Sequence, residues 1–300
     1  MDLTLSKQRR WTSSVTYDAR SIISYNLAIG TNGQDLRRCW EEHPEFHALP
    51  TFTSLAVINI MGELTRDLPN LLPLYQPEKH PHVHAEHYLE LLRPLPTEGT
   101  LLSEARIIDV VDWRSGVAVI VGITTKDAKT STEICYNEWT SFFMRMPGHG
   151  ASKASPSKTR ASTPLPRRPP DTIATHQTTP EQGALYRAAT GELNPMHIDP
   201  DHGKAAGFPG PILSGTCTIG IGARHVLDQF VNGDPARFKS VRLGLSKPVF
   251  PGEIIRTEMW REDHGERIVY RQVALDGRVV ISQAEVWLTD VGAGRGRSQL

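Results

Sequence analysis

Cysteine is scarce in this sequence, so disulfide bonds and thiolate metal sites are not expected. The 300 residues include three cysteines, Cys39, Cys135 and Cys217, which lie far apart and form no CxxC pair. This spacing argues against a disulfide framework and against a thiolate zinc site, and it favours a reducing compartment.

An excess of charge and a long hydrophobic run are also missing. Lys plus Arg and Asp plus Glu each total 33, so the formal net charge is zero at pH 7. A neutral chain offers no electrostatic surface for duplex nucleic acid or anionic membrane, and we expect neither as a partner. The charge-free stretch 211–223 is too short and too polar to span a bilayer. Residues 1–11 lack the apolar core of a signal peptide, so we expect no secretion.

A stretch rich in proline, serine and basic residues divides the chain. Residues 151–170 contain five Pro, four Ser, five Lys or Arg and no acid. Such a composition cannot bury a core and predicts a linker. We therefore predict an N-terminal half over 1–150, a linker over 151–170 and a C-terminal half over 171–300, in line with about two domains for this length.

The two halves carry a weak internal repeat. Residues 24–30 (SYNLAIG) match residues 185–191 (LYRAATG) at Tyr, Ala and Gly, and residues 93–102 match 247–255 with one residue of slippage. In each half a short helical segment precedes a longer apolar one, and strand-like runs follow. The repeat predicts two copies of one α+β unit.

Periodicity locates several elements. The alternating apolar residues from Val117 to Ile123 and the run 278–289, rich in Val, Ile and Trp, predict strands. Residues 214–230 begin with Ser and are crowded with small side chains, which predicts a helix that other segments approach closely. Residues 49–64 are the matching helix candidate in the first half.

The densest unusual chemistry lies between Gly191 and Gly215. Pro195 and Pro200 in this region fix φ and bias the residues before them toward extended geometry. We therefore predict a rigid turn, and rigidity is what positioned acid and base groups require.

Four polar side chains lie on or beside this turn. Glu192 and His197 could hold one water molecule between them and move protons to and from it. In the alternative interpretation, Asn194 and Asp199 only cap turns and the loop has no catalytic role.

Residues 186–215 closely resemble the signature of the MaoC-like hydratase type 2 family, the (R)-specific enoyl-CoA hydratases. The resemblance extends to residues 84–96 (HAEHYLELLRPLP) and to residues 246–253 (SKPVFPGE), so it covers nearly the whole chain. It implies an α+β double hot-dog fold, in which each half wraps an antiparallel sheet around a long central helix. It further implies an acyl-chain pocket in the first half and the catalytic motif in the second.

The implied reaction is the reversible hydration of trans-2-enoyl-CoA to (3R)-3-hydroxyacyl-CoA. Coenzyme A is part of the substrate, and no metal or redox cofactor is required. Carried over by position, Glu192 and His197 are the catalytic pair with Asn194 nearby, and Gly215 supplies a backbone N–H for the thioester oxygen.

This sequence departs from the family pattern at two of these positions. The family normally has Asp in place of Glu192 and commonly has His in place of Ser214. Three interpretations of the glutamate remain open: the loop has shifted to suit it, the enzyme is slow, or the substrate is a different thioester.

Four further residues are predicted to bind the substrate. His84 and Glu86 belong to the first-half motif and are expected to line or brace the mouth of the site, which Ser214 borders. Lys247 is a candidate for binding a coenzyme A phosphate, by placement alone, as are Lys204, Lys239 and Arg242. The alternative for these cations is a solvated surface charge.

Other functions remain open at this point. The chain could be a hot-dog thioesterase or a non-catalytic acyl-thioester binder. His197, Asp199 and His264 imitate the ligand set of a non-haem iron oxygenase, a remote alternative. The histidines at 80, 82, 84 and 87 alternate like a chelate on one strand face, although we predict no metal.

The last three residues, Ser298-Gln299-Leu300, resemble the Ser-Lys-Leu peroxisomal address. We expect a peroxisomal protein that binds the import receptor through them, with the cytoplasm as the alternative. A homodimer is the expected assembly.

Overall fold

One antiparallel sheet of ten strands organises the computed structural model, which describes residues 7–72, 74–113, 115–148, 157–159 and 164–289. The strands of the first half are β1 (Trp11–Tyr17), β2 (His82–Leu91), β3 (Gly99–Trp113), β4 (Gly116–Asp127) and β5 (Glu133–Met144). Those of the second half are β6 (Thr172–Gln177), β7 (Phe238–Leu245), β8 (Ile254–Glu262), β9 (Arg267–Ala274) and β10 (Val279–Leu288).

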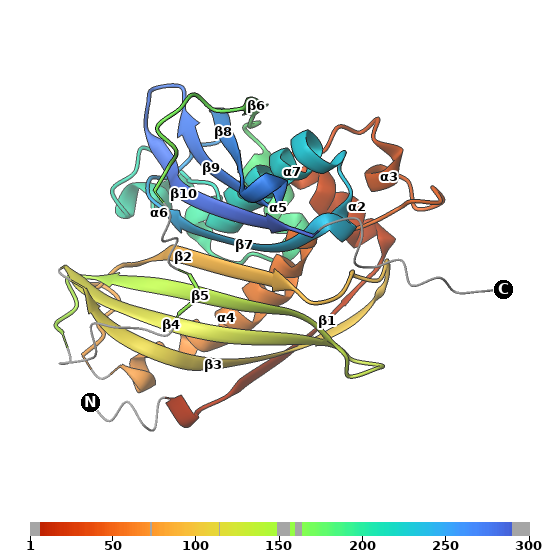
Figure 1. Ribbon diagram of the computed structural model, residues 1–300. Coiled ribbons are helices and arrows are strands. Elements are labelled where there is room, and N and C mark those ends of the chain that lie inside the picture. The colour runs from red at the N-terminus through yellow and green to blue at the C-terminus, as the bar shows by residue number, and fades with distance from the viewer. Residues whose placement is uncertain (1–6, 73, 114, 149–156, 160–163, 290–300) are drawn as a thin grey trace.

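The strand order is symmetric about the middle of the sheet (Figure 1). Outward from the centre, the first half runs β2, β5, β4, β3, β1, and the second runs β7, β10, β9, β8, β6. Each strand therefore has a counterpart at the same place in the other half, which confirms the predicted repeat. The central strands β2 and β7 pair directly, with Glu86 opposite Gly244, so the two halves share one continuous sheet.

Two long helices lie on the inner side of this sheet, one in each half (Figure 1). The helix α7 (Gly215–Val231) agrees with the prediction over 214–230. The segment predicted over 49–64 forms the short turn η1 (Pro50–Thr53) and then α4 (Ser54–Leu71), which continues past the predicted end. A sheet wrapped around one long helix in each half confirms the α+β double hot-dog fold.

The remaining helices are short. They are α2 (Ala19–Ala28), α3 (Leu36–Cys39), α5 (Gln182–Thr190), η2 (Pro195–His197), α6 (Pro200–Ala205), η3 (Pro235–Arg237) and η4 (Asp263–Gly265). Tyr25 of α2 and Tyr186 of α5, which the repeat aligns, are both buried and lie in contact, with ring centroids 5.9 Å apart. The aligned segments of the two halves therefore meet in the core.

Small residues on α7 admit their neighbours closely, as predicted. A Cβ at Gly220 would lie 2.8 Å from Cγ2 of Ile29, the C-cap residue of α2, and one at Gly222 would lie 2.9 Å from the ring of Tyr270 on β9. Glycine costs helix stability by about 1 kcal/mol relative to alanine. Close packing of α2 and β9 on the helix offsets this cost.

Strand predictions from alternation are also confirmed. The alternating residues from Val117 to Ile123 lie on β4 and are buried in one cluster with Ile60 and Leu64 of α4. The run predicted over 278–289 is β10.

Half of the predicted linker, residues 151–156 and 160–163, lies outside the described residues, and its boundaries stay a prediction. Of its central part, residues 157–159 lie on the outer face of β2 and β5. The Lys158 backbone N–H donates to Glu138 at 2.7 Å, and the Lys158 ammonium contacts Glu90 at 3.1 Å.

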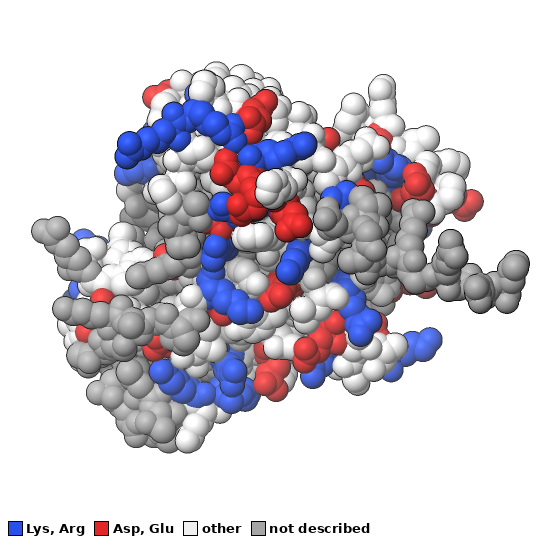
Figure 2. Space-filling model, viewed as in Figure 1, with Lys and Arg blue, Asp and Glu red and all other residues white. Residues whose placement is uncertain are grey.

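The outer face of the sheet carries charges of both signs, and Figure 2 shows them intermixed on the face in view. Arg242 pairs with the buried Glu285 at 2.5 Å, and Arg271 pairs with Glu258 at 2.5 Å. Within the described residues, no helix is long and apolar enough to cross a membrane.

We expect the protein to lose stability in mild acid through His225. This α7 imidazole accepts or donates a 2.8 Å hydrogen bond with Thr257, and burial, Arg224 and His176 lower its pKa to about 2. The unfolded side chain titrates near 6.5, so below that pH the unfolded chain binds a proton that the folded chain does not. The contribution is therefore present above about pH 6.5 and is lost as the pH falls, by up to about 1.4 kcal/mol per unit.

Urea unfolding at pH 7 and pH 5 measures this effect. The midpoint should fall with pH in the wild type and should fall less in His225→Asn, which cannot be protonated. Equal pH dependence in both proteins would show that His225 does not cause the loss.

Candidate active site

The motif loop follows α5 and begins with a reversal at Gly191, whose φ of 71° is left-handed. Pro195 then starts η2, and Pro200 starts α6. Proline suits the first position of a helix because its missing N–H has no acceptor there. The two prolines thus begin two successive short helices, with His197 at the end of the first, where the sequence had indicated a single rigid turn.

Turn capping is part of what this loop does. Asn194 Oδ1 accepts from the backbone N–H of Met196 at 3.1 Å, and Asp199 Oδ1 accepts from that of Asp201 at 2.8 Å. Asp199 is further occupied by His202, 2.6 Å away. The capping interpretation therefore accounts for Asp199. Asn194 caps through its Oδ1 alone, and its amide nitrogen takes no part in the capping.

His197 is held in one orientation. Its Nδ1 lies 2.9 Å from the carbonyl oxygen of Ile212, and a carbonyl can only accept, so Nδ1 carries the ring proton in the neutral form. The lone pair is then on Nε2, which lies 3.5 Å from Nδ2 of Asn194. This arrangement suits a base that acts at Nε2.

The Glu192 carboxylate lies on the other side of Asn194. Its Oε1 accepts from the Asn194 backbone N–H at 3.0 Å, and its Oε2 lies 3.5 Å from Oγ of Ser214. Arg187 donates to the Glu192 carbonyl at 2.6 Å and anchors the backbone there. The structure therefore brings Glu192, Asn194, His197 and Ser214 together at one place.

The start of α7 lies beside this cluster. Ser214 occupies the N-cap position, but its side chain makes no capping bond, because its hydroxyl lies 2.9 Å from that of Thr216. The first N–H groups of a helix have no acceptor within the helix and are available to a ligand. A Cβ at Gly215 would lie 2.6 Å from Leu245 and 3.3 Å from Nδ1 of His84. Glycine is thus required for the close approach of both.

His84 reaches this point because β2 contains a bulge. His84 pairs with Ser141 and Glu86 pairs with Thr140, which leaves Ala85 as an extra residue. The bulge turns Glu86 to the outer face, where it accepts from Thr159 at 2.8 Å. The structure therefore separates the two predicted mouth residues: His84 faces the α7 start, and Glu86 lies behind the sheet.

The same bulge brings His87 to the inner face, opposite Trp139. The His84 ring stacks on Trp139 with centroids 3.4 Å apart, and the His87 ring meets His84 edge-on at 5.2 Å. Trp139 was not singled out from the sequence, although its alternation with Asn137 on β5 gives it an inner-face position.

No metal centre emerges from the histidines of the described segments, where no three His, Cys, Asp or Glu side chains gather. His80 accepts from the Gln76 backbone N–H, and His82 bonds to Tyr75. Asp199, which the iron-oxygenase alternative required as a metal ligand, caps the N-terminus of α6.

The predicted phosphate-binding cations are not gathered at the site. Lys247 is exposed in the loop after β7, two residues beyond Leu245. Arg242 faces outward and is paired with Glu285. A role for Lys247 toward coenzyme A stays a prediction.

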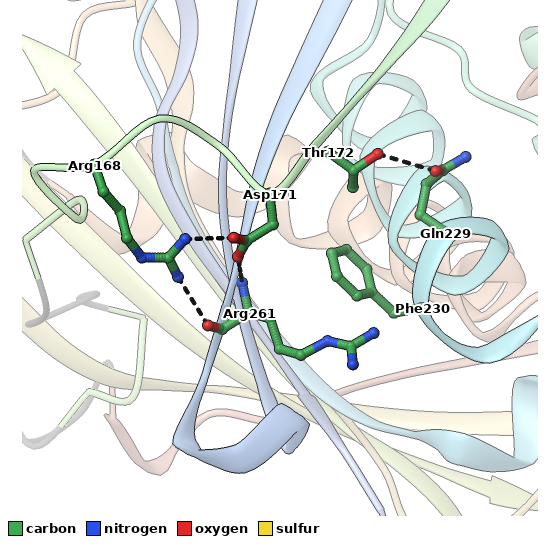
Figure 3. A pocket seen from close by; sticks show the side chains of 6 residues that line it. All are labelled: Arg168, Asp171, Thr172, Gln229, Phe230 and Arg261. Carbon is green, nitrogen blue, oxygen red and sulfur yellow. Dashed lines mark hydrogen bonds and ion pairs between the residues drawn. The ribbon is translucent and has the colours of Figure 1, made fainter.

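A separate pocket lies at the far end of α7 (Figure 3). Its lining includes Gln229 and Phe230, which at 1.5 Å per helical residue lie roughly 20 Å along the axis from Gly215. Arg168 is occupied by ion pairs with Asp171 at 2.5 Å and Glu262 at 2.8 Å. This pocket does not belong to the motif cluster.

Comparisons with known proteins identify the family of each half and agree with the fold. The first half matches the MFE-2 hydratase 2 N-terminal domain over residues 15–145, and the second matches the MaoC-like domain over residues 161–283. A solved MaoC-like dehydratase from Phytophthora capsici is 28% identical with a TM-score of 0.88, covering 98% of this chain and 100% of that one. A double-hotdog protein from Mycobacterium tuberculosis, 14% identical, shares the fold with a TM-score of 0.60, covering 95% of this chain and 96% of that one.

Two curated relatives are informative. Mouse peroxisomal multifunctional enzyme type 2 is 40% identical over 91% of this chain but only 36% of the mouse protein. The chain spans less than half the length of such multifunctional relatives. The probable enoyl-CoA hydratase 2 of Dictyostelium discoideum is 31% identical over 92% of both chains. The chain therefore belongs to the MaoC-like hydratase 2 family.

Proposed function

We propose that this protein hydrates trans-2-enoyl-CoA to (3R)-3-hydroxyacyl-CoA and catalyses the reverse dehydration. The observation that carries the proposal is the cluster of Glu192, Asn194 and His197 beside the open start of α7. The names of the hydratase 2 relatives support the substrate class. The (3R) outcome is carried over from the family.

The chemistry follows from where charge develops. The oxygen of a bound water attacks C3 while Nε2 of His197 takes its proton, and the double-bond electrons move toward the thioester oxygen. The Gly215 N–H stabilises that oxygen at the positive end of the α7 dipole. The proton taken up by the His197–Glu192 pair is delivered to C2, so the pair ends in its starting state. The net change adds one water across C2=C3 and uses no metal or redox cofactor.

A hydration assay over a series of enoyl-CoA chain lengths tests the proposal. Loss of the ultraviolet absorption of the conjugated thioester should accompany formation of a hydroxyacyl product that a (3R)-specific dehydrogenase oxidises. Thiol release, followed in parallel with a chromogenic disulfide, should stay at background. Thiol release without hydration would identify a thioesterase, and binding without either reaction would identify an acyl-thioester binder.

Gly215→Ala is expected to reduce kcat about 100-fold or more, in the range seen when an oxyanion donor is lost. The added methyl group would meet Leu245 and His84, so these side chains or the start of α7 must shift, which displaces the proposed donor. Circular dichroism checks the fold. Gly210→Ala, at a glycine where a Cβ meets nothing within 4 Å, is the matched control and should keep its activity. Alanine keeps the backbone N–H, so full activity in Gly215→Ala would show that the methyl group does not displace the donor and would contradict this prediction.

Cellular location is a second proposal. The names of relatives from mouse and Arabidopsis thaliana include the word peroxisomal, and we carry this location to the present chain. Import-receptor binding by Ser298-Gln299-Leu300, which lie outside the described residues, stays a prediction, as does a homodimer. Imaging the protein with a free and with a tagged C-terminus tests the first of these.

A further inference from the structure

The first half contributes one side chain whose environment the mechanism has not yet explained. The His84 ring is fixed between Trp139, parallel to it within 7°, and the edge of His87. Such packing on two sides leaves the imidazole one orientation. In that orientation Nδ1 faces the start of α7, 3.3 Å from where a Cβ of Gly215 would be.

Both ring nitrogens of His84 are buried, and neither has a hydrogen-bond partner of good geometry among the described residues. A weaker contact with the Glu86 backbone raises the pKa of the ring slightly, against the larger effect of burial. Leaving a buried polar group without a partner costs about 1–3 kcal/mol. A ring packed this tightly with its nitrogens unsatisfied is suited to meet a polar group that arrives with a ligand.

The charge state of the ring fits a donor rather than a cation. Burial, and then the neighbouring His87, lower the pKa of His84 well below its usual value. The imidazole is therefore neutral at physiological pH and carries one N–H. A neutral imidazole in a desolvated site can polarise a carbonyl oxygen by hydrogen bonding.

We propose that Nδ1–H of His84 is a second hydrogen-bond donor to the thioester oxygen, beside the backbone N–H of Gly215. The proposal rests on the proposed function, since it takes the thioester oxygen to lie at Gly215. Under it, the catalytic residues come from both halves of the chain: the second half supplies base and carboxylate, and the first supplies a donor across the β2–β7 junction.

Two substitutions separate the donor from the ring. His84→Phe keeps a flat ring over Trp139 and removes the N–H, and kcat is expected to fall about 10- to 1000-fold, with a smaller change in KM. His84→Gln keeps an N–H donor and should retain more activity than His84→Phe. The matched control is His82→Phe, on the same strand face, where His82 stacks on Phe143 with centroids 4.9 Å apart. This control should hydrate at the wild-type rate.

A second readout does not depend on turnover. Infrared difference spectra of a bound saturated acyl-CoA, labelled with ¹³C at the thioester carbonyl, report how strongly that carbonyl is polarised. The stretch should lie at lower frequency in the wild type and in His82→Phe than in His84→Phe. If His84→Phe does not fold, the ¹⁵N signal of the His84 ring, identified by its absence in His84→Gln, must shift when the saturated acyl-CoA binds.

The outcomes distinguish the two proposals. A wild type that neither hydrates enoyl-CoA nor binds acyl-CoA defeats the proposed function. A wild type that hydrates, while His84→Phe keeps its kcat and its carbonyl frequency, overturns the second donor alone. An unshifted ¹⁵N signal does the same.

Discussion

His197→Ala is expected to reduce enoyl-CoA hydration about 100- to 10,000-fold, the usual contribution of a positioned acid or base. The ring is held by the Ile212 carbonyl, so that its Nε2 lone pair is the available base, and alanine offers neither the base nor the orientation. Steady-state kcat for the most active chain length is the quantity to compare. Stability should change little, because the side chain is half-buried rather than part of the core.

The control is His202→Ala, five residues further along. His202 is also near the motif but is exposed and contacts Asp199, away from the cluster. It should remain as active as the wild type. Similar losses in both variants would indicate a general disturbance of the loop, and no loss in His197→Ala would move the base to another residue.

The effect of a Glu192 substitution on kcat should depend on whether the new side chain keeps the negative charge. Glu192→Gln keeps the size and removes the negative charge, and Glu192→Ala removes both, so each is expected to lose about 100- to 10,000-fold in kcat. Glu192→Asp keeps a carboxylate and should retain the activity or raise it, because Asp is the usual residue at this position in the family.

Comparing Glu192→Asp with Glu192→Gln also tests two of the three interpretations of the glutamate, a slow enzyme and a shifted loop. Displacing a reacting group by about 1 Å can cost on the order of 100-fold. A faster Glu192→Asp enzyme would show that the natural side chain is badly placed. Equal losses of kcat in Glu192→Asp and Glu192→Gln would show that the loop is adapted to the longer side chain, together with Ser214, which lies 3.5 Å from Oε2.

The repeat and the apolar periodicity predicted the fold well because both arise from the chain's own pattern. Tyr25 and Tyr186 match in sequence and meet in the core, and the residues from Val117 to Ile123 alternate as β4 requires. The end of α4 was missed, since its last turn contains Pro69, a residue that ordinarily ends a helix.

The geometry of the site was less accessible from sequence. The prolines were read as flanks of one turn, whereas each starts a helix, because a single sequence does not reveal where capping bonds form. The family motif predicted that His84 and Glu86 both line or brace the mouth of the site, but a bulge that no residue type announces set them on opposite faces. Trp139 acquires its importance only through contact with His84, which lies 55 positions earlier in the chain.

The extra residue at Ala85 lets β2 carry one residue more than its partner strand without disturbing the sheet. His84 pairs with Ser141 and Glu86 with Thr140, so a chain lacking Ala85 would place His84 and Glu86 at consecutive paired positions. Consecutive residues of a regular strand point to opposite faces, so His84 would stay inside and Glu86 outside. A single-codon deletion there would remove the bulge and keep the imidazole in the interior, whereas counting aligned positions alone would suggest that the two faces had been exchanged.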